Sequence, residues 1–519
     1  MKLGALAGLA IVASCGDNLP PPEPGPLAPL VFSSCLNGMF ECGTLVVPAD
    51  WSSESALTIE LPVVRAPARD PSQRIGVLVF NFGGPGEPTL QPIVDNYPAQ
   101  PIATSQDLTA RFDWVLMDWR GVATTTPELS CLDATTGSAL AAEQFAPGSD
   151  ADWAALFSLG SDVAAGCLAN GSNAALLARQ DTDSAARDLE ALRIGLGESQ
   201  LNMWGVSYGT RLASMYASIF PEHVRAFALD SPMFPQPSLP EFLTAQSESF
   251  DAELGRFFAW CAGASATDCP FRTADGSGAS VAAEFEQLLD NADTSPIVAD
   301  GVTLDRASID LAATTQMYFP TVEWPPLATA LASLEAGDGS AMAKLVMSSA
   351  FDSANDDNAF SSYQNVCAQD MPIPAGLDSP ASFEAFAMSL EPLAPHVGLQ
   401  NAAAQAFAVT WPTIPPFQHP IGNAAAPPLL VTATRNDPAT PYAWASELVA
   451  AFDNGSYLVT YEGDGHANAQ FHRCIGEVTA SFLIDPTKPP STTDCPEVDP
   501  TAQHARETRA PIAGRPQRR

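Results

Sequence analysis

Residues 201–220 read Leu-Asn-Met-Trp-Gly-Val-Ser-Tyr-Gly-Thr-Arg-Leu-Ala-Ser-Met-Tyr-Ala-Ser-Ile-Phe. The first part is a short, mostly apolar run with the length of a strand. The second part places apolar side chains on one helix face, and Pro221 ends that helix. Between the two runs lies the pattern G-x-S-x-G at residues 205–209. A strand, a sharp turn and a helix around such a serine predict that Ser207 is an exposed nucleophile on a strained turn.

The residues around Ser207 suit this chemistry. The flanking glycines leave room for the turn, and the N-terminus of the following helix favours developing negative charge. The backbone amide of Tyr208 can donate to an oxyanion. The alternative is a chance match in a chain with many glycines and serines. Because the strand–turn–helix context is present and no second G-x-S-x-G occurs, we favour the nucleophile.

Strand-like and helix-like runs alternate along the chain. The strand-like runs are residues 43–48, 56–64, 75–82, 114–118, 226–229, 428–433 and 456–461, and residues 183–196 are typical of a helix. The first two strands suit an opening hairpin. This alternation predicts an α/β fold with a mostly parallel sheet and helices on both faces. Ligands should bind at the carboxyl ends of the strands, where Ser207 lies.

The pattern changes between residues 235 and 426, where helical, proline-punctuated sequence replaces buried strands. We therefore expect a core in two parts, residues 32–234 and 427–487. Residues 235–426 are predicted to form an inserted helical cap over the site. Residues 488–519 form a polar tail that becomes basic toward its end.

Two late strands each lead to a candidate partner of Ser207. The run at 428–433 leads to Asp437, and the run at 456–461 leads through a glycine to His466. In this chain order His466 is the candidate general base, and Asp437 is the carboxylate that orients it.

The other acids and histidines fit these roles less well. Asp464 is too close in sequence to His466 to reach its second nitrogen easily, and Asp230 follows an earlier strand. The remaining histidines are expected in a loop, on a following helix, in the cap or in the tail: His223, His472, His396, His419 and His504.

The composition describes a globular and strongly acidic protein. Among 519 residues, 59 acidic and 23 basic side chains give a formal charge of −36. This charge repels nucleic acid, so we expect no nucleic-acid partner. No C-x-x-C pair and no histidine cluster with metal-ligand spacing occurs, so we expect no metal site and no cofactor.

The N-terminus has the features of an export signal. Lys2 precedes an apolar run at residues 3–12 that is too short to span a bilayer. It leads to Cys15 within a stretch that resembles the lipobox of bacterial lipoproteins, so residues 1–15 are predicted to be a lipoprotein-type signal peptide with lipidation at Cys15. The alternative is a cleaved secretory peptide and a secreted product. The proline-rich residues 16–31 suit a stiff linker. We expect an exported protein of the bacterial cell envelope, in contact with a membrane through its lipid anchor only.

The cysteines agree with export, because disulfides form in oxidising compartments. Nearby cysteines suggest the pairs Cys35–Cys42, Cys131–Cys167, Cys261–Cys269 and Cys474–Cys495, which leaves Cys367 alone. The spacing by itself does not fix this connectivity.

Several short motifs follow one another in a fixed order. They are Cys42-Gly-Thr-Leu-Val-Val-Pro48, Gly83-Gly-Pro-Gly86, Asp118-Trp-Arg-Gly121, Asp188-Leu-Glu-Ala-Leu-Arg193, the serine motif, Asp437-Pro-Ala-Thr-Pro441 and Gly465-His466. In this order they resemble the secreted bacterial α/β-hydrolase peptidases of the tripeptidyl aminopeptidase and proline iminopeptidase type, over residues 35–495.

The resemblance implies an α/β-hydrolase fold with a cap and an acyl-enzyme mechanism on peptides that have a free N-terminus. It also implies that a backbone amide of the Gly83-Gly84 turn, assigned here to Gly84, is the second oxyanion donor beside Tyr208. Cap carboxylates would receive the ammonium group of the substrate.

Two motifs depart from the family pattern. Glu87 and Pro88 follow the glycine turn where the family usually has Gly-Ser-Gly, and Ala123 and Thr125 replace a glycine and a serine. Neither change removes a catalytic group, but both leave the substrate open. Glu87 and Asp370 are candidates for binding the amine, and a surface or structural role is the alternative for each.

Two other functions are compatible with the sequence. An esterase acting on small carboxylic esters is the main alternative, because the fold does not determine which acyl group an enzyme hydrolyses. A non-catalytic surface binding protein is less favoured, because the serine, acid and histidine are all present. The sequence does not indicate substrate length or oligomeric state.

Overall fold

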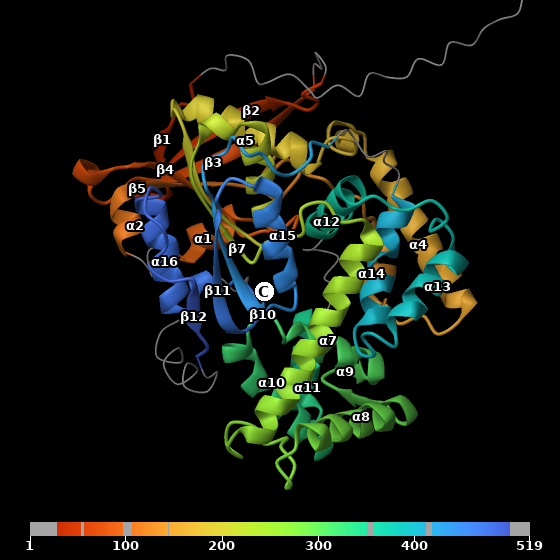
Figure 1. Ribbon diagram of the computed structural model, residues 1–519. Coiled ribbons are helices and arrows are strands. Elements are labelled where there is room, and N and C mark those ends of the chain that lie inside the picture. Colours follow the sequence, from red (N-terminus) through yellow and green to blue (C-terminus); the bar gives the residue numbers. More distant parts are fainter. Residues whose placement is uncertain are drawn as a thin grey trace, which may run out of the picture.

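The computed structural model describes residues 29–52, 57–96, 106–143, 145–349, 357–411 and 418–498, and its centre is a ten-stranded sheet (Figure 1). In spatial order the strands are β1 (Ser33–Cys35), β2 (Phe40–Pro48), β3 (Thr58–Ala66), β5 (Phe112–Met117), β4 (Gly76–Asn81), β6 (Leu201–Val206), β7 (Val224–Asp230), β10 (Leu430–Asn436), β11 (Tyr457–Asp464) and β12 (Asp494–Pro496).

The sheet is antiparallel at one end and parallel through the rest. Strands β1, β2, β3 and β5 pair antiparallel, and every neighbouring pair from β5 to β12 is parallel. The expected opening hairpin is β2 with β3, where Cys42 lies opposite Val64. The predicted mostly parallel α/β sheet is therefore confirmed.

Both faces of the sheet are covered by helices, which is why its central strands are apolar throughout. Val77 and Val79 of β4 belong to the apolar cluster on one face, and Leu78 and Phe80 belong to the cluster on the other. The first face is packed by α5 (Thr182–Leu196), α6 (Tyr208–Ile219) and α15 (Tyr442–Phe452), and the second by α1 (Leu90–Asn96), α2 (Gln106–Arg111) and α16 (Arg473–Ile484).

Helices also make up most of the chain between β7 and β10. They are α7 (Leu239–Gly263), α8 (Gly278–Thr294), α9 (Arg306–Thr315), α10 (Pro320–Glu335), α11 (Ser340–Ser349), α12 (Asp357–Asp370), α13 (Pro380–Leu390) and α14 (Gly398–Thr410), with a small hairpin of β8 (Ile297–Ala299) and β9 (Val302–Leu304). We call this region the cap.

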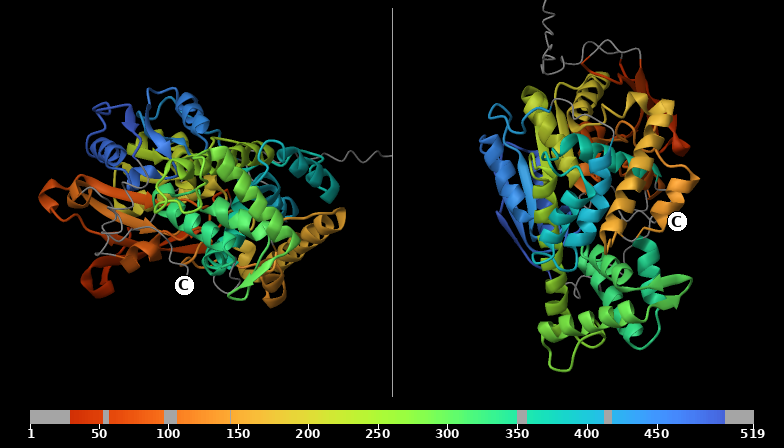
Figure 2. Two further views of the ribbon diagram at one scale, coloured as in Figure 1. Left: turned by 90° about the horizontal axis from the view of Figure 1, so that it is seen from below. Right: turned by 90° about the vertical axis from the view of Figure 1, so that its right-hand side faces the viewer.

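The cap has two parts with different cores. Helices α12, α13 and α14 share the apolar cluster of the first sheet face, together with α4 (Asp150–Ala169), which packs on α13 and α14 (Figure 1). The later part of α7 and helices α8 to α11 surround a separate cluster that contains Phe257, Phe285 and Trp324. This second part extends away from the sheet (Figure 2).

The remaining helical segments are short. They are α3 (Ala134–Ala141) and the 3₁₀ turns η1 (Leu36–Gly38), η2 (Pro71–Gln73), η3 (Gly171–Ala175), η4 (Pro221–His223) and η5 (Asn468–Gln470).

All four expected disulfides are present: Cys35–Cys42, Cys131–Cys167, Cys261–Cys269 and Cys474–Cys495. Cys367 is buried and has no disulfide partner among the described residues. The predicted pairing is confirmed. It ties β1 to β2 and fastens β12 to α16.

Some predictions fall outside the described residues. The predicted signal peptide at 1–15, with Cys15, lies outside them, as do residues 16–28 of the predicted linker and residues 499–519 of the tail. Over the ranges that are described, no helix is both long and apolar enough to cross a membrane.

Candidate active site

Ser207 lies in a strained turn between β6 and α6. Its backbone has φ 55° and ψ −125°, a conformation that non-glycine residues rarely adopt. The amide of Ser207 donates to the carbonyl of Asp230 on the neighbouring strand β7 at 2.9 Å. This is the geometry expected of a serine held above the end of a parallel sheet at the start of a helix.

The two glycines of the serine motif are required by close packing. A Cβ at position 205 would lie 2.4 Å from the carbonyl oxygen of Gly209, and a Cβ at position 209 would lie 2.7 Å from the carbonyl oxygen of Asn81. Helix α6 therefore starts so close to β6 and β4 that neither position has room for a side chain.

The Gly83-Gly84 turn packs directly against the serine turn. A Cβ at Gly83 would lie 2.9 Å from the Cβ of Ser207 and 2.9 Å from the backbone nitrogen of Tyr208. Gly84 and Tyr208 line the same cavity as Ser207. The two residues predicted to supply the oxyanion donors thus line one cavity together with the serine.

Asp437 and His466 form a buried hydrogen-bonded pair. Asp437 follows β10 and His466 follows β11, and Nδ1 of His466 lies 2.9 Å and 3.0 Å from the two carboxylate oxygens. Backbone amides of Ala439 and Thr440 donate to Asp437 Oδ1 at 3.0 Å and 2.9 Å, and the Thr440 hydroxyl donates to Oδ2 at 3.0 Å. These donors fix the plane of the carboxylate and hold it toward the imidazole.

The environment of His466 favours its charged form. Burial by itself would lower the pKa of His466, but the charge and hydrogen bonds of Asp437, with the charge of Asp230, raise the pKa above its ordinary value. Nδ1 of His466 is hydrogen-bonded to Asp437, so Nε2 of His466 is the nitrogen available to a nucleophile. No hydrogen bond joins Ser207 Oγ to His466 in the described part of the chain.

The rival acids have other partners. Asp464 pairs with Arg256 of the cap and accepts a hydrogen bond from Asn436 at 2.9 Å. Asp230 accepts from Thr432 Oγ1 at 2.8 Å and from the amide of Ala469 at 3.1 Å.

The other described histidines have structural contacts. Nδ1 of His223 lies 3.0 Å from Oε1 of Glu190. Nδ1 of His419 lies 2.5 Å from Oδ2 of Asp183. His396 lies 3.2 Å from Asp310. His472 stacks on Tyr461 with a centroid distance of 4.2 Å, and burial lowers its pKa to about 4.

The Asp118-x-Arg120 motif supports the scaffold. Asp118 accepts from the amides of Thr89 and Leu90 and so holds the start of α1. Arg120 Nε donates to Asp188 of α5 at 2.7 Å, and Trp51 Nε1 donates to the same carboxylate at 2.9 Å.

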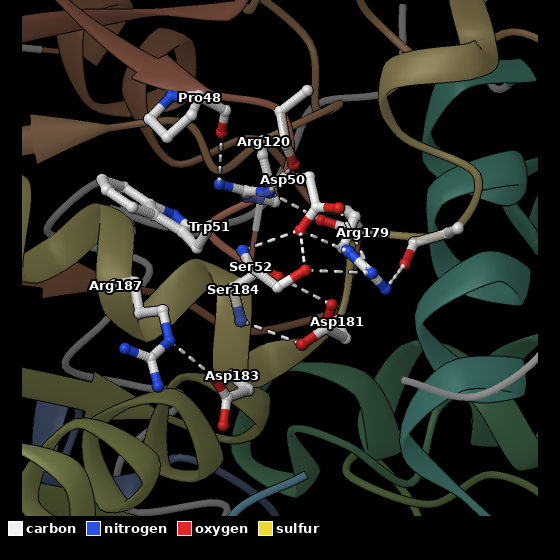
Figure 3. A network of polar contacts seen from close by, with 12 residues as sticks. Pro48, Asp50, Trp51, Ser52, Arg120, Arg179, Asp181, Asp183, Ser184 and Arg187 are labelled. Carbon is white, nitrogen blue, oxygen red and sulfur yellow. Dashed lines mark hydrogen bonds and ion pairs between the residues drawn. The ribbon is translucent and has the colours of Figure 1, made fainter. Parts of the chain in front are cut away.

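Further polar contacts surround this ion pair. Figure 3 shows Arg120 reaching the carbonyl of Pro48, with the pair Arg187–Asp183 nearby. The network ties β2 and the turn after β5 to α5, the helix that precedes the serine strand.

A cavity of about 310 Å³ lies between the serine turn and the cap. Most of its lining is apolar and aromatic, including Phe242, Phe250 and Tyr318 from the cap. The sequence did not single out these cap residues, because no motif marks them. Only their packing around the serine turn identifies them.

The cavity contains one of the two predicted amine-binding carboxylates, and its charge is already compensated. Asp370 forms an ion pair with Arg211, with 3.2 Å between Nε and Oδ2, and accepts from the amide of Thr182 at 3.1 Å. Both side chains of the ion pair are almost fully buried. These contacts favour the structural role that the sequence left open for Asp370, because Arg211 compensates the charge that would attract the ammonium group.

Glu87, the other predicted carboxylate, is exposed beyond the glycine turn and is not among the residues that line the cavity. It is close enough to Tyr318 for its charge to contribute, after burial and two other carboxylates, to the raised pKa of that phenol. Among the described residues that line the cavity, Arg211 and Asp370 are the charged side chains.

A strained serine turn, a glycine turn against it and an Asp–His pair at the ends of neighbouring parallel strands define a serine-hydrolase site on an α/β-hydrolase sheet. Comparison with known families agrees. A family model described as the α/β hydrolase fold matches residues 76–271, and one described as TAP-like protein matches residues 394–495.

Curated relatives match along most of the chain. Carboxylesterase B of Mycobacterium tuberculosis is 30% identical over 469 residues, covering 88% of this chain and 86% of that protein. Serine protease Hip1 of the same species is 28% identical, covering 88% and 87%. Tripeptidyl aminopeptidase of Streptomyces lividans is 28% identical, covering 86% and 81%. The chain belongs to the α/β hydrolases with a TAP-like C-terminal region.

Proposed function

We propose that this protein is a serine peptidase that removes short peptides or single residues from the free N-terminus of its substrates. The observation that carries the proposal is the Asp437–His466 pair beside the strained Ser207 turn. The similarity to a tripeptidyl aminopeptidase and to a serine protease over most of the chain supports the peptide as substrate.

In the proposed mechanism, Ser207 Oγ attacks the scissile carbonyl carbon. His466 Nε2 takes the hydroxyl proton, and Asp437 stabilises the imidazolium that forms. The amides of Gly84 and Tyr208 donate to the oxygen of the tetrahedral intermediate. When the C–N bond breaks, His466 returns the proton to the leaving amine. Water, activated by the same histidine, then hydrolyses the acyl-enzyme and restores the Ser207 hydroxyl.

The cavity offers neutral hydrogen-bond acceptors for the substrate amine. Gln405 Oε1 and Thr314 Oγ1 are buried, line the cavity and have no hydrogen-bond partner in the described structure. Buried oxygens without partners are costly unless a ligand satisfies them. Since Arg211 compensates Asp370, we propose that these cap oxygens receive N–H groups of the substrate.

The test compares a tripeptidyl arylamide that has a free amine with its N-acetylated twin, beside a Ser207→Ala control. For an aminopeptidase we expect acetylation to lower kcat/KM by about 30-fold, or about 2 kcal/mol. Equal rates that vanish in the control would keep the serine hydrolase and reject the exopeptidase. Gln405→Leu should lower kcat/KM for the free-amine peptide more than for a p-nitrophenyl ester.

An esterase acting on small carboxylic esters is the second candidate. The mainly apolar lining and the compensated charge of Asp370 favour a neutral substrate, and one relative is named carboxylesterase B. A preference for p-nitrophenyl esters over every peptide, beyond the intrinsic reactivity of the ester, would decide for this activity.

We further propose that the protein is exported and anchored by a lipid on Cys15. Four disulfides in the described residues support an oxidising compartment. The lipobox-like sequence before Gly16 supports the anchor. In a bacterial host, Cys15→Ala should move the protein from the detergent phase to the aqueous phase. A wild-type protein already in the aqueous phase would contradict the anchor.

A further inference from the structure

Asp230 and Ser231 form a buried corner at the end of β7 that the proposed chemistry does not use. Their exposed fractions are 1% and 0%. Ser231 has φ 55°, which is unfavourable for a serine and persists only where surrounding contacts hold it. A buried carboxylate followed by a strained residue, so close to a reactive site, needs a physical reason.

The corner is bonded to the serine turn and to the strand that carries the acid. The Asp230 carbonyl accepts from the amide of Ser207 at 2.9 Å. Thr432, on β10 before Asp437, donates its hydroxyl to Asp230 Oδ1 at 2.8 Å, and its carbonyl accepts from the amide of Ser231 at 2.8 Å.

The same corner is bonded to the loop that carries the histidine. The Ser231 hydroxyl accepts from the amide of Ala467, the residue after His466, at 2.9 Å. Asp230 Oδ2 accepts from the amide of Ala469 at 3.1 Å. Two adjacent side chains thus bind the His466 loop at two points.

We propose that Asp230 and Ser231 are positioning residues that set the place of His466 relative to Ser207. The inference rests on the proposed serine-hydrolase chemistry. Ser207 follows β6 and His466 follows β11, and these strands are separated in the sheet by β7 and β10. Neighbouring strands alone therefore do not hold the two side chains in register. The Asp230–Ser231 corner connects them, because it lies at the end of β7, the strand beside β6, and hydrogen-bonds both to the Ser207 turn and to the His466 loop.

Asp230 also acts on His466 through its charge. Burial raises the pKa of Asp230 to about 7, and the charged groups that face it are His466 and Asp437. After Asp437, the charge of Asp230 raises the pKa of His466. Asp230 does not replace Asp437 as the orienting acid, since both of its oxygens are used by Thr432 and Ala469.

The variants separate geometry from charge. In Asp230→Asn the side-chain oxygen can still accept from Ala469 and the side-chain nitrogen can donate to Thr432 Oγ1, so the ties remain and the charge is lost. Asp230→Ala loses both ties and charge, and Ser231→Ala loses only the bond to Ala467. Ser214→Ala is the matched control. It removes a fully buried hydroxyl of α6 that has no partner in the described residues.

The kinetic test uses a p-nitrophenyl ester and the free-amine peptide with the full-length enzyme. We expect Asp230→Ala and Ser231→Ala to lower kcat by about 10- to 100-fold with little change in KM, because the histidine is misplaced. Asp230→Asn should recover most of the kcat lost in Asp230→Ala. Ser214→Ala should match the wild type. Unchanged kcat in the two alanine variants would overturn the positioning role.

The second test follows His466 itself by NMR with histidine-selective labelling, assigned by its loss in His466→Gln. Asp230→Asn should lower the pKa of His466 and move the acidic limb of kcat/KM to lower pH, while His472 does not shift. An unchanged His466 pKa would overturn the electrostatic part. This measurement needs no substrate. If the wild type hydrolyses neither substrate, the proposed function fails, whereas the NMR result still decides the electrostatic part of the inference.

Discussion

The backbone carbonyl of Tyr318 accepts a hydrogen bond from the amide of His466 at 2.8 Å, and the Tyr318 ring lies edge-on to the imidazole with 5.7 Å between centroids. Tyr318 lies between α9 and α10 of the cap. A Cβ at Gly465 would lie 2.9 Å from the same carbonyl oxygen. The cap therefore packs tightly on the histidine loop as well as covering the cavity.

We predict that Tyr318→Leu lowers kcat, because the ring that borders His466 is replaced by a smaller side chain. The loss should be about 10-fold for a p-nitrophenyl ester, in the range expected when a catalytic group is misplaced. Tyr318→Phe keeps the ring and the backbone bond, and it should stay near the wild-type kcat. A wild-type rate in Tyr318→Leu would show that the cap contact does not position His466.

Ser207→Ala should abolish both hydrolysis and labelling by a fluorophosphonate while leaving the fold intact. Asp437→Asn should lower kcat by about 10⁴-fold, the loss measured when the orienting acid of another Ser-His-Asp triad is replaced by asparagine. Steady-state kinetics and probe labelling at matched protein concentration check both variants. Labelling that persists in Ser207→Ala would assign the nucleophile elsewhere.

Gly83→Ala should remove activity and lower stability, because a Cβ there would lie 2.6 Å from the carbonyl oxygen of Val206 and the backbone has φ 109°. A displaced turn loses an oxyanion donor, which costs about 100-fold or more in kcat. Gly255→Ala is the control, since nothing lies within 4 Å of its Cβ on the exposed side of α7. It should stabilise the helix by about 0.5–1 kcal/mol. Thermal melts and kcat of the two variants make the comparison.

Asp188→Ala should destabilise the fold strongly. Arg120 and Asp188 have exposed side-chain fractions of 1% and 0%, so the substitution leaves a buried guanidinium without its ion-pair partner. Breaking a buried pair in this way costs about 3–5 kcal/mol. Denaturant unfolding measures the change. The exposed pair Arg473–Glu477 gives the matched control, and Arg473→Ala should leave the unfolding midpoint unchanged. Equal midpoints for both variants would contradict a structural role for the Arg120 motif.

The buried carboxyl of Asp230 predicts a pH-dependent stability. Burial raises its pKa from 3.8 to about 7, so between these values the folded protein binds a proton that the unfolded chain has lost. Its contribution to stability therefore falls as pH rises from about 4 to about 7. Asp230→Asn lacks this loss, and its Tm relative to the wild type should increase from pH 5 to pH 8. A constant difference across that range would contradict the raised pKa.

Local sequence was sufficient for the elements and for the order of the site residues. Residues 205–209 predict the serine turn, and Gly205 is required by a backbone contact only four residues away, with the carbonyl oxygen of Gly209. Nearby cysteines also suggested the disulfide pairs, which are separated by at most 36 residues, and the structure fixes the connectivity. Apolar runs marked the strands, although the observed strand ends differ from the predicted runs by up to three residues.

Contacts between distant segments were not predictable. Asp370 was one candidate for binding a substrate amine, with a structural role as the alternative, and its charge is compensated by Arg211, 159 positions earlier. Nothing near Asp370 in the chain indicates this partner. The contact of Tyr318 with His466 and the hydrogen bonds from the Asp230–Ser231 corner also join residues that are far apart in the sequence.

The sequence by itself determined the alternation of strands and helices and the serine turn, because these depend on residues close together along the chain. It also indicated the order of the candidate serine, acid and histidine, and nearby cysteines suggested the disulfide pairs that the structure contains. The tertiary structure alone decided which charges are compensated, which cap residues meet the histidine and how the separated turns are tied together. Those properties depend on the spatial order of the strands and on the seating of the cap. Both arise only when surfaces from distant parts of the chain pack against each other.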